Sequence, residues 1–144
     1  RERTPLMAFL HKAGAVLSIT GEKVTEEQAV AAVRAAGDSL PLAGFTVTLR
    51  LGDPPQYLLA VEADCAEDRL SGLAQALDAE LSRLNVEYAS KRESGRLAMP
   101  ELRILPVGCY AAWRKKQANA GRPDGQIKPP HLAQREEFLR ELAG

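Results

Sequence analysis

Residues Phe45–Leu51 read FTVTLRL, and this stretch decides the fold. Its odd-numbered positions are apolar and its even-numbered positions are polar, which is the two-residue period of a half-buried β-strand. The next residues, Gly52–Pro55, have the composition of a turn. The segment Gln56–Ala63 then returns as a second strand pattern. The two segments are therefore predicted to form an antiparallel β-hairpin.

A helix with one continuous apolar stripe is predicted after the hairpin. Its leucines recur at helical spacing, at Leu70, Leu73, Leu77, Leu81 and Leu84. Such a stripe is predicted to pack against the core rather than to bind a ligand. The polar stretch Val86–Gly95 that follows is predicted to be irregular, and Leu102–Val107 is predicted to be a further strand.

Upstream of the hairpin, a strand, a tight turn and a helix start occupy only fourteen residues. Ala15–Ile19 is an apolar strand pattern, and Thr25 with Gln28 has the spacing of a helix capping box. This arrangement leaves Glu22 and Lys23 on the turn, where proteins commonly display functional groups. The alternative interpretation is that both are solvated turn charges without a function.

The predicted order from Ala15 to Val107 is β, α, β, β, α, β. Two such halves make an α+β fold, a ferredoxin-like core with a mixed or antiparallel sheet and helices on one face. Tyr110–Ala120 and the amphipathic C-terminal segment are predicted as extra helices that cover the remaining face of the sheet. The chain length of 144 residues fits a single domain, residues 1–144.

Composition narrows the classes of function. The chain has 19 basic and 19 acidic side chains and a net charge of +0. This balance disfavours binding to nucleic acids or to membrane surfaces, because both rely on an excess of Lys and Arg. No apolar run reaches the roughly 20 residues of a membrane span. Cys65 and Cys109 form no CxxC pattern, so a reducing cytoplasm is expected, and His11 and His131 lack ligand-spaced neighbours, so no metal site is expected.

Six motifs, spread over nearly the whole chain, carry a family resemblance. They lie within Thr4–Glu26, Gln56–Glu62, Leu84–Arg92, Met99–Arg103, Val107–Tyr110 and Gly125–Pro130. In order and spacing they resemble the C-terminal domain of the auxin-responsive acyl acid amido synthetases, which belong to the adenylate-forming superfamily. Departures from the plant pattern, such as Ala89 and the pair Cys109-Tyr110, make the resemblance one to a bacterial-type member.

The resemblance implies that this chain is the mobile C-terminal lid domain of a longer, two-domain enzyme, with residues 1–14 close to the hinge. Such enzymes use ATP with Mg, bound mainly by the N-terminal adenylation domain, to activate a carboxylic acid as an acyl-adenylate. They then transfer the acyl group to an amine, usually an amino acid. The implied setting is cytoplasmic, and the isolated domain is not expected to be catalytic.

Two lysines are implied as the working residues of the lid. Lys128 would be catalytic and would contact the phosphates and the reacting carboxylate, and Lys23 would contact the phosphates or the other domain. A compact ammonium on a flexible stem suits both tasks, and a closing lid brings it in while excluding water. The supporting candidates are Glu22 and Gln126 for nucleotide or phosphate binding, and Tyr88 and Arg92 for positioning.

The alternative function is a free-standing ferredoxin-like module that binds a small molecule or has a regulatory role. It predicts a native chain of this length, stabilised by a metabolite but not by ATP. A catalytic domain in its own right is disfavoured, because the sequence has no glycine-rich phosphate loop, no Cys/His nucleophile pair and no defensible carboxylate pair.

Overall fold

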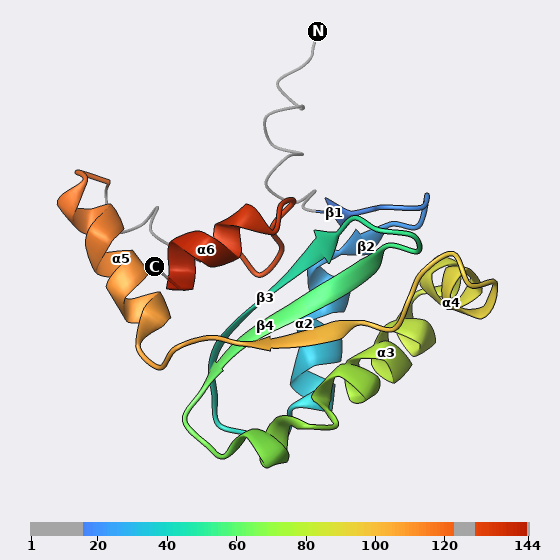
Figure 1. Cartoon of the computed structure of the whole chain (residues 1–144), viewed down its shortest axis with the longest axis horizontal. Helices are drawn as coiled ribbons and strands as arrows, with labels where there is room; N and C mark the ends of the chain where they lie inside the picture. The colour runs from blue at the N-terminus through green and yellow to red at the C-terminus, as the bar shows by residue number, and fades with distance from the viewer. Residues whose placement is uncertain (1–15, 123–128, 144) are drawn as a thin grey trace, which may run out of the picture.

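The computed structural model describes residues 16–122 and 129–143, with a three-stranded mixed sheet at the centre (Figure 1). Strands β3 (Leu42–Arg50) and β4 (Gln56–Ala63) pair antiparallel, and β5 (Glu101–Ile104) pairs parallel to β4. The predicted hairpin is therefore confirmed. The α+β class with a mixed sheet is also confirmed, and the arrangement is compatible with a ferredoxin-like core.

Helices α2 (Glu26–Ala36) and α3 (Leu73–Leu84) pack on one face of the sheet. Helix α2 starts as predicted, because the Thr25 hydroxyl accepts from the Gln28 N–H and the Thr25 N–H donates to Gln28 Oε1. A short 3-10 helix, η1 (Glu67–Leu70), precedes α3. The leucine stripe faces the core as predicted. Its fully or almost fully buried members are Leu70, Leu73, Leu77 and Leu81.

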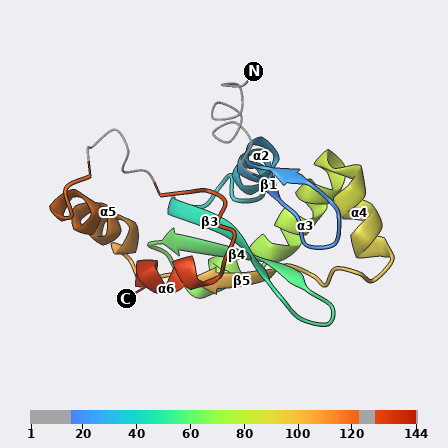
Figure 2. The same ribbon diagram turned by 90° about the horizontal axis from the view of Figure 1, so that it is seen from above.

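The opposite face of the sheet is covered by α5 (Cys109–Asn119) and α6 (Glu137–Ala143), as expected for the extra C-terminal helices. The polar side chains of β3 on this face are buried as well. The Thr46 hydroxyl donates to the Pro130 carbonyl, at 3.0 Å, and the Thr48 hydroxyl donates to the Ala133 carbonyl, at 2.6 Å. Figure 2 shows the segment that leads to α6 passing beside β3, to which it is joined by a parallel bridge.

Two local expectations are wrong. The first predicted strand does not enter the main sheet, because β1 (Val16–Leu17) pairs with β2 (Val24–Thr25) in a separate two-stranded ribbon. The stretch predicted to be irregular contains a helix, α4 (Val86–Glu93). Its start is capped by Asn85, whose side chain accepts from the N–H of Tyr88 at 2.8 Å.

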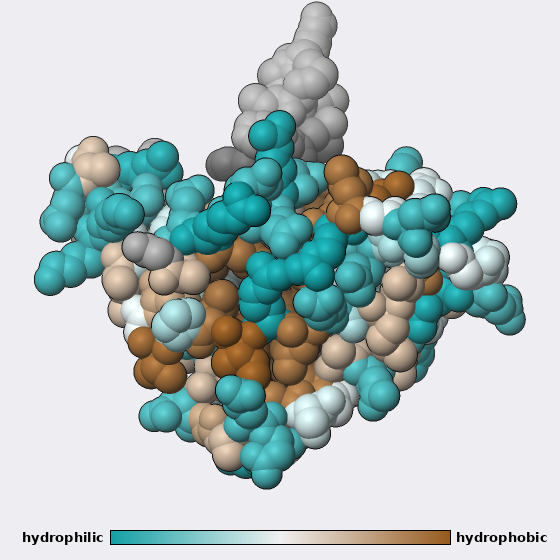
Figure 3. Space-filling model, in the orientation of Figure 1, coloured by the Kyte–Doolittle hydropathy of each residue, from teal (hydrophilic) through white to brown (hydrophobic). Residues whose placement is uncertain are grey.

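Polar and charged residues cover much of the face seen in Figure 3, with apolar residues gathered in its lower middle. The large apolar side chains that are exposed are Leu51, Val86, Met99, Ile104 and Val107. Across residues 16–122 and 129–143, the length and apolar character needed to cross a membrane are not met by any helix.

Candidate functional site

The turn between β1 and β2, residues 18–23, is built around a buried carboxylate, and we call it the Lys23 turn. Glu22 Oε1 accepts from both the N–H and the hydroxyl of Thr20, at 3.0 and 2.5 Å. Its Oε2 accepts from the N–H of Ile19 at 3.1 Å and from the hydroxyl of Tyr57 at 2.6 Å. Four donors therefore satisfy one carboxylate, and three of them belong to the turn itself.

The expected place of Glu22 on the turn surface is wrong, because the residue is fully buried. Burial raises the pKa of Glu22, but hydrogen bonds from Thr20, Tyr57 and the turn backbone outweigh it and hold the pKa below its usual range. The group is thus a buried anion that organises the turn. Its oxygens are already paired, and a carboxylate does not attract phosphate oxygens, so its geometry favours an anchoring role.

Lys23 is exposed at the end of this turn, while its backbone is held from both sides. The flanking residues Glu22 and Val24 are fully buried. The Lys23 carbonyl accepts from Asn85 Nδ2 at 2.7 Å, and the same amide donates to Gln28 Oε1 at 3.0 Å. A free side chain on a fixed backbone is the arrangement that displays a cation to a ligand or to another domain.

Tyr88 and Arg92 both lie in α4 and share one partner, Asp78 of α3. The Tyr88 hydroxyl donates to Asp78 Oδ1 at 2.8 Å, and Arg92 Nε donates to the same oxygen at 2.7 Å. The hydrogen bond to Asp78 raises the pKa of Arg92, and burial raises that of Tyr88. The ring of Tyr88 packs edge-on against Tyr57, with centroids 5.5 Å apart. Four predicted site residues, Glu22, Lys23, Tyr88 and Arg92, thus belong to one connected cluster.

Three residues of this cluster were missed as site residues: Tyr57, Asn85 and Lys91. Tyr57 lies in an apolar strand pattern that indicates only core packing, and nothing in the sequence shows which residue its hydroxyl meets. Lys91 Nζ lies 3.8 Å from the place that a Cβ on Gly21 would occupy, so a second ammonium approaches the turn. Gly21 has a φ of +103°, which a left-handed turn requires.

Lys128 and Gln126 lie outside the described residues, so the structure does not show whether Lys128 meets Lys23. The chain that follows them is described from residue 129. There the Pro130 carbonyl is held by Thr46, whose hydroxyl also lies 2.6 Å from that of Tyr110. The segment bearing Lys128 is therefore anchored to β3 shortly after the lysine.

Helix α5, which precedes the Lys128 segment, is held at its N-terminus by a second buried carboxylate. Glu62 of β4 accepts from the N–H of Gly108 at 2.8 Å and from that of Tyr110 at 3.1 Å. Burial and this carboxylate raise the pKa of Cys109 to about 11, so its thiol is protonated at neutral pH. Cys109 is thus a packing residue rather than a nucleophile.

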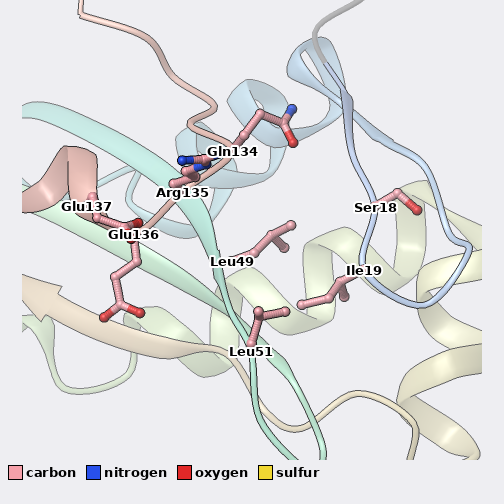
Figure 4. A pocket seen from close by; sticks show the side chains of 8 residues that line it. All are labelled: Ser18, Ile19, Leu49, Leu51, Gln134, Arg135, Glu136 and Glu137. Atoms are coloured by element: carbon pink, nitrogen blue, oxygen red, sulfur yellow. The ribbon is translucent and has the colours of Figure 1, made fainter.

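A groove of about 630 Å³ adjoins the Lys23 turn (Figure 4). Ile19, Leu49 and Leu51 point toward one another and form its apolar floor. Polar side chains form the rest of its lining: Ser18, Gln134, Arg135, Glu136 and Glu137. Gln134 Nε2 donates to the Val16 carbonyl at 2.8 Å, so the C-terminal segment and the β1–β2 ribbon meet here.

The rim of this groove is fixed by an ion-pair network. Glu136 Oε2 lies 3.2 Å from Arg50 Nη2 and 3.3 Å from Arg103 Nη2. Arg50 also pairs with Glu101 at 2.8 Å. The hydrogen bond from Arg50 holds the pKa of Glu136 below its usual range. The network joins β3, β5 and the start of α6, and so fixes the C-terminal segment across the sheet.

Comparisons with known proteins agree with this fold. The family described as the GH3 family C-terminal domain matches residues 27–137. The solved structure titled GH3.15 acyl acid amido synthetase has a TM-score of 0.75 and 21% identity, and covers 89% of this chain and 24% of that chain. A second, AtGH3.15 acyl acid amido synthetase in complex with 2,4-DB, has a TM-score of 0.72 and 19% identity, over 89% and 25%.

At these identities the likeness to the two solved structures shows the fold. This chain spans about a quarter of the length of either. A search of curated protein sequences gives no match.

Proposed function

The chain belongs to the family of GH3 C-terminal domains, as its sequence motifs predicted, and on that premise we propose that it is the lid domain of an ATP-dependent acyl acid amido synthetase. In this proposal residues 1–144 are one domain of a longer cytoplasmic enzyme, and residues 1–14 lie near its hinge. Its partner is the N-terminal adenylation domain of the same protein. The substrates are a carboxylic acid and an amine or amino acid. The family match over residues 27–137 carries the proposal.

The proposed reaction has two steps, and the lid assists both. A substrate carboxylate oxygen attacks the α-phosphorus of ATP and pyrophosphate leaves; an amine then attacks the acyl carbon and AMP leaves. ATP, with Mg, would be held mainly by the N-terminal domain. The first step concentrates negative charge on the phosphates and the carboxylate, so a lysine delivered by the lid stabilises it.

Lys128 is proposed as the catalytic lysine of this step, with Gln126 beside it in the same segment. Lys23 is proposed to contact the phosphates or the N-terminal domain. The exposure of Lys23 and its fixed backbone fit that role, because an ammonium held at a defined point binds an anion with little loss of freedom. Glu22 supports Lys23 as an anchor of the turn, and Tyr88 with Arg92 holds α4 in place.

Isotope exchange between pyrophosphate and ATP in the intact enzyme tests the proposal. The first acid to supply is 2,4-DB, the compound named with a solved relative, followed by other aryl carboxylates. Lys128→Ala is expected to slow exchange by about 100-fold or more, the order seen when a transition-state charge contact is lost. Lys115→Ala, which removes an exposed lysine of α5, is the matched control and is expected to leave exchange unchanged. Normal exchange in the Lys128 variant would remove this lysine from the mechanism.

The groove beside the Lys23 turn favours a second candidate function, a free-standing module that binds a small molecule. Its volume and apolar floor suit a metabolite with an apolar body. The mass of the native polypeptide separates the two functions. A species much heavier than 15.6 kDa supports the lid proposal, whereas a native chain of this size, stabilised against heat by a metabolite and not by ATP, supports the free-standing module.

A further inference from the structure

We propose that Tyr57 is a positioning residue for Lys23 and that it acts through the carboxylate of Glu22. The inference rests on the proposed function in one respect, since it takes Lys23 to act during adenylation. Tyr57 itself is buried and would touch no substrate. It would determine where the ammonium of Lys23 can reach.

The path from Tyr57 to Lys23 is short and continuous. Tyr57 lies near the start of the central strand β4 and is 1% exposed. Its hydroxyl is 2.6 Å from Glu22 Oε2, the residue directly before Lys23, and 3.4 Å from the Leu17 carbonyl at the start of the same turn. One hydroxyl of the rigid sheet thus meets the turn from below.

Core packing alone does not require this hydroxyl. A phenylalanine would fill the same space and make the same edge-on contact with Tyr88. The hydroxyl instead meets a fully buried carboxylate, and a buried charge is costly unless every partner is in place. A solvated turn with no task can keep its charge in water. The buried, fully paired carboxylate therefore indicates a turn whose shape must be exact to work.

A second contact closes the bracket from the other side. Asn85 donates to the carbonyl of Lys23 itself, and Asn85 also caps α4. The backbone of Lys23 is thus fixed between the sheet, through Tyr57 and Glu22, and α4, through Asn85. Its side chain stays exposed. Catalytic groups misplaced by about 1 Å lose up to roughly 100-fold in rate, so a bracket of this kind matters for a working lysine.

A double-mutant cycle in the intact enzyme tests the proposal, with pyrophosphate–ATP exchange in the presence of 2,4-DB as the rate. Tyr57→Phe is expected to slow exchange about 10-fold in the native background. In a Lys23→Ala background it is expected to cause no further slowing, because its effect passes through Lys23. The matched control is Thr48→Val, which also removes a fully buried hydroxyl bonded at 2.6 Å but lies away from the turn. The control is expected to leave exchange unchanged.

Amide hydrogen exchange in the same enzymes provides a structural readout. Tyr57→Phe is expected to speed exchange at Ile19 and Thr20, whose N–H groups bond to Glu22, and Thr48→Val is not. Full rate in Tyr57→Phe, or slowing that simply adds to that of Lys23→Ala, would overturn the positioning role and leave the lid function standing. Full rate in Lys23→Ala would overturn this inference and the role of Lys23, but not that of Lys128. An unmodified enzyme without exchange would overturn the proposed function itself.

Discussion

Asn85→Ala is expected to destabilise the chain strongly, because this side chain joins four segments. It accepts from the Tyr88 N–H at the start of α4, and it donates to the Lys23 carbonyl and to Gln28 Oε1 in the first turn of α2. Asn85 is 6% exposed, so water does not readily replace these partners. All three of its hydrogen-bonding contacts are lost in the alanine variant.

The magnitude follows from the contacts. Loss of an N-cap side chain costs about 1 kcal/mol, and up to 2. Each of the other two hydrogen bonds contributes about 1 kcal/mol net. The expected loss is therefore about 2–4 kcal/mol, a large fraction of the 5–15 kcal/mol typical of a whole domain.

Urea unfolding followed by far-ultraviolet circular dichroism measures this loss as a lower midpoint with an unchanged slope. Asn119→Ala provides the control, because Asn119 is exposed at the end of α5 and its loss is expected to change stability by no more than about 0.5 kcal/mol. If Asn85→Ala costs no more than Asn119→Ala, the junction that we describe does not hold the fold together, and the argument for a fixed Lys23 backbone fails with it.

Three further predictions concern the core, the second face of the sheet and pH. Leu77→Ala is expected to cost about 2–5 kcal/mol, since Leu77 is fully buried; an unmoved urea midpoint would contradict this. Gly44→Ala is expected to cost about 1–3 kcal/mol, because a Cβ there would lie 2.6 Å from the ring of Tyr110, and thermal unfolding would show no change if the ring can move aside. The folded-state pKa of Glu22 is lowered, so its stabilisation is present above the unfolded-state pKa and is lost as pH falls through the folded-state value. Glu22→Gln should therefore cost more free energy of unfolding at pH 7 than near pH 3, and an equal cost at both would show that the charge is not what the turn uses.

Local patterns predicted the elements that depend on nearby residues. The alternation in Phe45–Leu51, the leucine stripe and the capping box of Thr25 with Gln28 are all set within a few residues, and all are confirmed. Helix α4 was missed because its residues are mostly polar, and its contacts run from Tyr88 and Arg92 to Asp78 of another helix. Such partners cannot be found from the periodicity of α4 itself.

The sequence by itself determined the hairpin, the helices with apolar stripes, the family and the place of Lys23 directly after Glu22. Only the tertiary structure decided that Glu22 is buried, because its partner Tyr57 is 35 residues away in the chain. Likewise, the donor that fixes the Lys23 carbonyl, Asn85, is 62 residues away. Periodicity and capping are local properties of the chain, whereas the burial of a charge depends on which distant donors packing brings to it. For that reason the sequence could identify the lysine, and only the folded chain could show how its backbone is held.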